Sequence, residues 1–177
     1  MIDYNHLKKF SQSLKSNVNI NVYENVETNY GITSYCRLII NSRKMVKDLI
    51  KHGCVPNKSN ILKPPIGVPN NLIRHFIRGY FDGDGSYIQG KEKRISFIGT
   101  DEVLFFILEN LPIEKDKQFA KRNKEHIVSE LRFGKKQEVL DTLKYMYLNS
   151  NVYLDRKHDL VIENYNKFEE LSSTTIR

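Results

Sequence analysis

The residues of this chain that could carry out metal-dependent chemistry are two aspartates separated by one glycine. Asp82 and Asp84 belong to the run Asp82-Gly83-Asp84-Gly85-Ser86, which follows an apolar stretch that begins at Leu72. Carboxylate oxygens at a turn are ligands that Mg²⁺ and Ca²⁺ accept. A helix ending here would hold both carboxylates at the negative pole of its dipole, where they are unfavourable unless a cation balances them. The run therefore predicts a divalent cation at the C-terminal end of a helix.

The same run admits other interpretations. Asp-Gly pairs are common in tight turns, so an ordinary turn is one alternative. An EF-hand loop beginning at Asp82 would need glycine at its sixth position and glutamate at its twelfth, and these are Tyr87 and Lys93. A sugar-nucleotide transferase using Asp-x-Asp for Mn²⁺ would place the motif after a strand of a parallel sheet, whereas here it ends a helix. The EF-hand interpretation therefore fails, and the sequence gives no support to the transferase interpretation.

The stretch before the aspartates has the apolar spacing of a helix. Gly79 costs a helix about 1 kcal/mol relative to alanine, which makes sense if another helix backbone approaches closely there. Glycine at the end of the run is expected to end the helix in the left-handed conformation, which other residues resist. The residues predicted to share one face are Leu72, Phe76, Gly79, Tyr80 and Phe81.

Composition limits the class of protein. The chain has 177 residues, with 28 Lys and Arg against 21 Asp and Glu, and a net charge of +7. This balance suits a polyanion such as nucleic acid, although many soluble proteins are moderately basic. No apolar run approaches the roughly 18 residues of a membrane helix, and residues 1–7 contain no signal-peptide region. Cys36 and Cys54 lack the spacing of a zinc site or a disulfide framework. A cytoplasmic protein without a membrane segment is expected.

Helices alternate with hairpins along the chain. Besides the helix before Asp82, helices are predicted over residues 3–15, 42–53, 100–110 and 135–148, and a final helix is predicted to follow residues 154–157 and to reach 171. Strands are predicted over residues 17–23, 32–40, 86–90, 94–99, 117–122 and 125–133. This pattern predicts an α+β fold with short antiparallel sheets that carry helices on one face.

The two parts of the chain repeat one pattern. A helix led by aspartate begins at Asp3 and again at Asp101. A strand end, a small residue and basic residues that open a helix occur at 38–44 and again at 131–137. Each repeat would leave one face of its sheet polar and open. The alternating side chains of such a face can read the major groove of DNA.

Residues 76–86 resemble the LAGLIDADG motif of homing endonucleases. Gly79, Asp82, Asp84 and Gly85 match fixed positions of the motif, and aromatic residues replace some of its small aliphatic ones. Residues 49–53 with 56–59, 132–136 and 153–157 also resemble stretches of the phage, intein and intron members. The resemblance implies tandem αββαββα lobes that pack through their motif helices and set antiparallel sheets as a saddle over double-stranded DNA. The chain would then comprise a first lobe truncated at its N-terminus (1–60), a proline-rich connection (61–71), a complete second lobe (72–171) and a frayed tail (172–177).

The resemblance also implies roles for single residues. Asp84 would be the catalytic, metal-binding acid, with the carbonyl of Gly83 as a second ligand, whereas Asp82 would be structural. The metal would be Mg²⁺ or Mn²⁺, and Ca²⁺ could occupy the site. Lys135 or Lys136 would lie near the scissile phosphate, with Arg43 or Lys44 as counterparts in the first lobe. Positive side chains expected to bind DNA are Arg37, Arg43, Lys44, Lys91, Lys93, Arg94, Lys117, Lys121, Arg122 and Arg132.

The sequence departs from the family pattern in its first lobe. Asp84 precedes Asp101 by 17 residues, and no such motif lies at that distance before Asp3. One carboxylate cannot by itself build a paired metal site that stabilises both the attacking and the leaving oxygen. The motif helix would therefore pair through Leu72, Phe76, Gly79 and Tyr80 with a second copy or a second chain, unless the chain is a remnant. The expected function is a site-specific DNA endonuclease. The alternative is a non-cleaving DNA-binding regulator, a maturase-like RNA-binding protein or an inactive remnant on the same fold.

Overall fold

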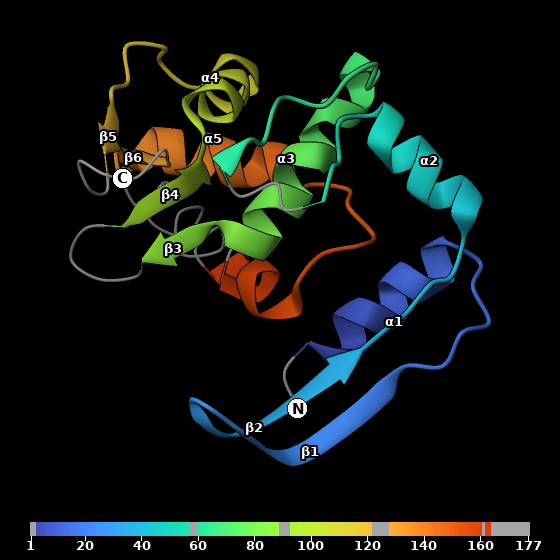
Figure 1. Cartoon of the computed structure of the whole chain (residues 1–177). Coiled ribbons are helices and arrows are strands. Elements are labelled where there is room, and N and C mark those ends of the chain that lie inside the picture. Colours follow the sequence, from blue (N-terminus) through green and yellow to red (C-terminus); the bar gives the residue numbers. More distant parts are fainter. Residues whose placement is uncertain (1–2, 57–59, 89–92, 122–127, 161, 164–177) are drawn as a thin grey trace.

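The computed structural model describes residues 3–56, 60–88, 93–121, 128–160 and 162–163. The fold is α+β with antiparallel sheets, as predicted (Figure 1). Residues 155–160 are also helical. The elements in chain order are α1 (Tyr4–Ser13), β1 (Asn21–Thr28), β2 (Gly31–Arg37), α2 (Arg43–Lys51), α3 (Asn70–Asp84), β3 (Ser86–Ile88), β4 (Arg94–Gly99), α4 (Asp101–Asn110), β5 (Phe119–Lys121), β6 (Ser129–Phe133) and α5 (Lys136–Tyr147).

The elements from α3 to α5 form the larger body. Their order is αββαββα, and their strands form one antiparallel sheet in the order β3-β4-β6-β5. Alternation along a strand sends every second side chain to the same face. Ile95 and Phe97 of β4 pair with Phe133 and Leu131 of β6, and all four are buried with residues of α3, α4 and α5. Figure 1 shows these helices gathered around the sheet.

The other face of this sheet carries mostly polar side chains, together with Ile88 and Ile98. Ser86, Ser96 and Arg132 are neighbours across three strands, and Arg94 lies two residues further along β4. We call Ser86, Arg94, Ser96, Glu130 and Arg132 the polar sheet face. Ser96 and Glu130 are nevertheless buried, and Arg132 pairs with Glu130 at 2.7 Å (Nη2 to Oε2). The sequence predicted a polar, solvent-exposed face. The face is polar, but the side chains at its centre are less exposed to solvent than predicted.

A smaller body contains α1 and the β1–β2 hairpin, and α2 connects it to the larger one (Figure 1). The predicted first strand at 17–23 is wrong in its bounds, because β1 begins at Asn21 and continues to Thr28. The pairing with β2 shifts between Tyr23 and Val26, where Asn25 has a positive φ of 52°. A bulge of this kind extends a strand beyond the run of strict alternation.

The helices of the two bodies correspond in position. Asp3 and Thr100 occupy the N-cap positions of α1 and α4, and both helices are 10 residues long. The two helices therefore align Asp3 with Thr100, one residue away from the predicted match to Asp101. Thr100 accepts a hydrogen bond from the Val103 amide, whereas the side chain of Asp3 makes no capping bond.

The corresponding helices differ in burial. Ser42 and Lys135 are the N-cap residues of α2 and α5, so Val46 and Ile50 correspond to Val139 and Leu143. Val139 and Leu143 are both 2% exposed, because α3 and the sheet cover that side of α5, whereas Val46 is 52% and Ile50 47% exposed. The order of elements thus repeats, but the burial does not. In the described part of the chain, no helix is long and apolar enough to cross a membrane.

Matched truncations test this difference in burial. Leu143→Ala should lower the free energy of unfolding by about 2–5 kcal/mol, because it leaves a cavity in the core. Ile50→Ala, at the corresponding position of α2, should cost about 1 kcal/mol or less, because half of the side chain already contacts water. Urea denaturation of the two variants measures both values. Equal costs would mean that the exposed side of α2 is covered in solution.

Candidate functional site

Arginine side chains hold the back of α3 against the chain that follows α5. Nε of Arg78 donates to the carbonyl of Val152 at 2.9 Å, and its Nη1 donates to the carbonyl of Met146 at 3.2 Å. Arg74, one turn earlier, donates to the carbonyl of Leu148. These contacts fix the rotation of α3 about its own axis.

Asp82 lies on the same side of α3 and is buried. Its Oδ1 accepts a hydrogen bond from the Tyr147 hydroxyl, and its Oδ2 accepts one from the Leu154 amide at 3.1 Å. Burial, together with the charge and hydrogen bond of Asp82, raises the pKa of Tyr147, so the phenol remains a donor. Asp82 is therefore structural, as predicted.

A lysine that sequence reasoning missed supplies positive charge at the end of α3. The ammonium of Lys157 is buried and donates to the carbonyls of Phe81, of Asp82 at 3.0 Å and of Gly85 at 2.7 Å. Burial lowers the pKa of Lys157, as does nearby Arg156, and the charges of Asp82 and Asp84 oppose the shift. The helix end therefore has a cation without any metal, which weakens the electrostatic reason for expecting one.

Gly85 ends α3 for a reason that differs from the predicted one. Its φ of −76° and ψ of 160° are extended, so no left-handed conformation is involved. A Cβ at Gly85 would lie 2.2 Å from Cδ2 of Phe81 and 2.7 Å from the Phe81 carbonyl oxygen. The turn needs glycine because the chain folds back tightly over the buried Phe81.

Among the described residues, the front of α3 makes no polar contact with another element, although its Phe76 packs against α4. We define the front face as Leu72, Phe76, Gly79 and Gly83, which lie within about 60° of one another at 100° per residue. Leu72 is 46% exposed, and a Cβ added at Gly79 or Gly83 would meet no atom within 4 Å. Phe81, which was assigned to this face, lies on the opposite side and is fully buried.

Asp84 is the last residue of α3, directly after Gly83 of the front face, and it is exposed. In the described part of the chain, no side chain hydrogen-bonds its carboxylate, and no donor reaches the carbonyl of Gly83. No three His, Cys, Asp or Glu side chains of the described residues converge into a metal site. Mg²⁺ takes six oxygens and commonly uses one or two carboxylates, substrate phosphates and waters. Asp84 and Gly83 therefore fit part of such a site, and one copy does not complete it.

Tyr80 lies beside the front face and is half-buried. Its hydroxyl donates to the carbonyl of Ile98 at 2.7 Å. Burial and the charge of Asp84 raise the pKa of Tyr80 to about 12, so the hydroxyl stays protonated. Tyr80 thus joins the end of α3 to β4, and Phe76 contacts Phe106 of α4 edge-on at 5.9 Å between ring centroids.

The basic residues predicted to bind DNA do not share one face. Arg94 and Arg132 belong to the polar sheet face. Lys117 is mostly buried on the helix side, with Nζ 2.7 Å from Oε1 of Glu138, and Lys121 pairs with Asp101 at 2.9 Å. Lys93 is described, whereas Lys91 and Arg122 lie outside the described residues.

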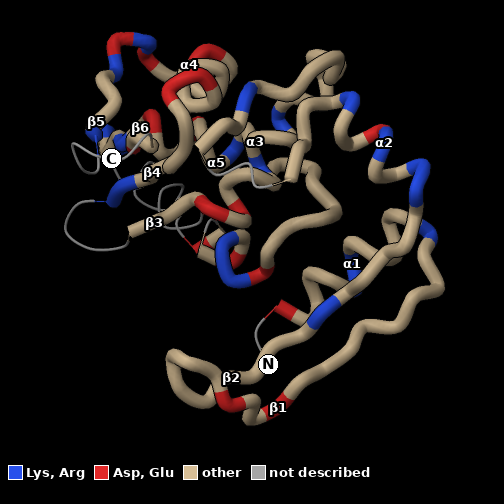
Figure 2. The backbone as a smooth tube through the Cα atoms, in the orientation of Figure 1, with Lys and Arg blue, Asp and Glu red and all other residues tan. Residues whose placement is uncertain are grey.

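The basic residues of the first part lie on other elements. Arg37 is in β2, with its guanidinium carbon 5.8 and 5.6 Å from the ring centroids of Tyr23 and Tyr35. Arg43 begins α2, and Lys44 pairs with Asp48 at 2.8 Å. Figure 2 shows that Lys and Arg are spread over most elements rather than concentrated on one.

Lys135 and Lys136 are not brought to Asp84 within one copy. They follow Phe133, whose partner Ile95 lies toward the Arg94 end of β4. Because β3 and β4 are antiparallel and Ser86 pairs with Ser96, a residue that precedes Ser86 lies toward the Gly99 end of β4. Asp84 is such a residue. The two lysines and the aspartate therefore lie at opposite ends of the sheet, and Lys135 pairs with Glu114.

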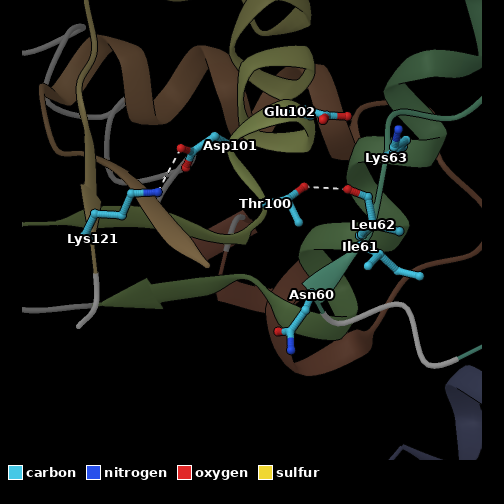
Figure 3. A pocket seen from close by; sticks show the side chains of 8 residues that line it. All are labelled: Asn60, Ile61, Leu62, Lys63, Thr100, Asp101, Glu102 and Lys121. Atoms are coloured by element: carbon cyan, nitrogen blue, oxygen red, sulfur yellow. Dashed lines mark hydrogen bonds and ion pairs between the residues drawn. The ribbon is translucent and has the colours of Figure 1, made fainter. Parts of the chain in front are cut away.

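A hollow of about 410 Å³ at the start of α4 is a second place to consider (Figure 3). The hydroxyl of Thr100 donates to the carbonyl of Leu62, and Asp101 is paired with Lys121 and hydrogen-bonded by Ser129. Acidic residues in the first turn also complement the helix dipole. The polar groups named here are already hydrogen-bonded or paired within the chain, so the hollow offers no such group to a ligand. The end of α3 therefore remains the candidate site.

Neither a protein-family model nor a curated protein matches this chain. The function is therefore argued from the geometry of α3 and its surroundings.

The back of α3 also predicts a pH dependence of stability. Nδ1 of His75 lies 2.6 Å from Nη1 of Arg78 and must be unprotonated to accept its hydrogen bond. Burial and the charges of Arg78 and Arg74 lower the pKa of His75 below 6.5. The unfolded chain binds this proton more readily than the folded one, so the free energy of unfolding should fall as the pH drops through and below 6.5.

His75→Asn isolates this contribution, since the asparagine oxygen can accept the bond and does not titrate. Urea denaturation at about pH 7.5 and about pH 5.5 should show wild type losing more stability than the variant. A difference between the two proteins that stays constant with pH would contradict the assignment to His75.

Proposed function

We propose that this chain is a DNA-binding subunit of LAGLIDADG type that hydrolyses phosphodiesters once its front face is paired. The observation that carries the proposal is the exposed carboxylate of Asp84 at the end of a helix that has a glycine-containing exposed face and a back held in place. In this proposal the larger body is a complete lobe, and α1 to α2 form part of a first lobe.

The glycines support pairing of the front face with a second helix. Each exposed helical glycine costs about 1 kcal/mol relative to alanine. Nothing in the described structure occupies the space beside Gly79 or Gly83. Close approach of another backbone gives a reason for this cost, because only glycine leaves room for it. A second copy of the chain is the simplest such helix, and a different chain is the alternative.

Pairing would bring a second acid to Asp84. Two Asp84 carboxylates and two Gly83 carbonyls would then provide the oxygens that one copy lacks. A divalent cation bound there supplies a Lewis acid and an activated water for hydrolysis. Asp84 would bind the cation, and Arg94 and Arg132 of the polar sheet face would contact phosphates on the DNA backbone.

Binding without cleavage is the second candidate function. It is favoured by the single exposed carboxylate at the site and by the position of Lys135 and Lys136 far from it. A protein of this kind would bind DNA or RNA through the same lobe, with Asp84 playing no chemical part.

Cleavage of a randomised double-stranded DNA library in the presence of Mg²⁺ tests the choice. Wild type should cut a subset of sequences, and Asp84→Asn should abolish cutting while keeping DNA affinity and thermal stability. Asp116→Asn, which removes an exposed carboxylate elsewhere, should cut like wild type. DNA binding by wild type without cutting would establish the second candidate, and cutting by Asp84→Asn would exclude the proposed metal role.

Gly79→Leu tests the pairing itself. The side chain has open space in one copy, so folding should be unharmed or improved by about 1 kcal/mol through helix propensity. It would also prevent close approach of a second helix. Light scattering should give about twice the 20.8 kDa chain mass for wild type and the single mass for the variant. A monomeric wild type would rule out the homodimer and leave a second chain as the partner.

A further inference from the structure

The proposed function makes no use of Lys157, although its ammonium lies closest to the turn that would bind metal. Its three acceptors are the carbonyls of Phe81, Asp82 and Gly85. They bracket Gly83 and Asp84, since two precede these residues and one follows them. An ammonium has three N–H donors, so these three carbonyls use all of them.

This contact fixes the backbone that carries the two predicted ligands. The last carbonyls of a helix have no partner within the helix, and helix ends fray for that reason. Gly83 adds conformational freedom because it lacks a side chain. With the carbonyls on both sides held by one nitrogen, Gly83 and Asp84 keep one conformation.

Other residues already attach the segment after α5 to α3. Arg78 binds the carbonyls of Met146 and Val152, and Asp82 accepts from the Leu154 amide. The Lys157 contact is therefore not required for docking that segment. Burying an ammonium without a paired carboxylate is also costly unless every donor is satisfied. An apolar side chain in this place would avoid that cost but would leave the carbonyls of Asp82 and Gly85 without this donor.

We propose that Lys157 is a positioning residue that fixes the turn presenting the Asp84 carboxylate and the Gly83 carbonyl, and so sets the affinity of this turn for a divalent cation. This inference rests on the proposed function, because it assigns Lys157 to the same site. Lys157 itself does not touch the metal or the substrate.

Lys157→Met tests the proposal, because it keeps the length and the apolar stem of the side chain and removes its donors. The measurement is Mn²⁺ affinity of the full chain by electron paramagnetic resonance, with Asp84→Asn defining the binding that belongs to this turn. Loss of a nearby positive charge alone would strengthen Mn²⁺ binding. A weakening of about tenfold, as loss of an outer-shell partner typically gives, therefore reports lost positioning.

Arg156→Met is the matched control. It removes the same charge from the adjacent residue, whose Nε lies 3.4 Å from Asp3 rather than at the turn. Its Mn²⁺ affinity should equal or exceed that of wild type. Lys157→Arg is the second variant if Lys157→Met fails to fold, since it keeps the charge but not the three-donor geometry, and it too should weaken binding.

The outcomes separate the two proposals. Unchanged or tighter Mn²⁺ binding by the folded Lys157 variants overturns the positioning role and leaves the proposed function standing. Absence of Asp84-dependent Mn²⁺ binding in wild type overturns the inference and, where wild type is dimeric, the proposed function as well. Weaker binding in the Lys157 variants but not in Arg156→Met supports the inference.

Discussion

The structure depends on the polar contacts between the back of α3 and the chain from Met146 to Lys157. Ile77 and Phe81 bury α3 against the sheet, but apolar burial is not directional and tolerates rotation of a helix. Arg78, Asp82 and Lys157 add direction, because each bonds to particular backbone groups on the other of these two segments, more than 70 residues away in the sequence. Buried charges that lose such partners are costly, so α3 has one favoured orientation. That orientation places the glycines outward.

Much of the fold could be predicted from the sequence because its signals are local. Alternation in β4 and β6 and helical spacing in α4 and α5 depend on residues a few positions apart, and the observed elements agree. Phe81 was misplaced because the aromatic residues of α3 lie on two faces, and spacing alone does not say which face contains the sheet. Gly85 was explained by conformation, whereas the actual constraint is the close approach of Phe81.

The site was less predictable because it depends on contacts between distant residues. The structural role of Asp82 was foreseen only through the family resemblance, which assigns the metal to Asp84. Lys157 was missed, although the need for a cation at the helix end was clear and residues 153–157 belong to the resemblance, because no local pattern shows that position 157 contacts positions 81–85. The positions of the basic residues also depend on contacts that the sequence does not reveal. Lys117 and Arg132 are equally positive in sequence, yet one pairs with Glu138 on the helix side and the other lies on the polar sheet face.

The residues at the end of α3 that lower stability lie where a functional site would require them. Stability alone would favour alanine at Gly79 and Gly83, at about 1 kcal/mol each, and an apolar residue in place of a buried ammonium. Natural chains depart from such local rules mainly at functional sites. The departures here surround one exposed carboxylate, whereas the hollow at the start of α4 has paired charges and a capped helix. These departures favour Asp84 as the functional residue, even though the electrostatics of the helix end no longer require a metal.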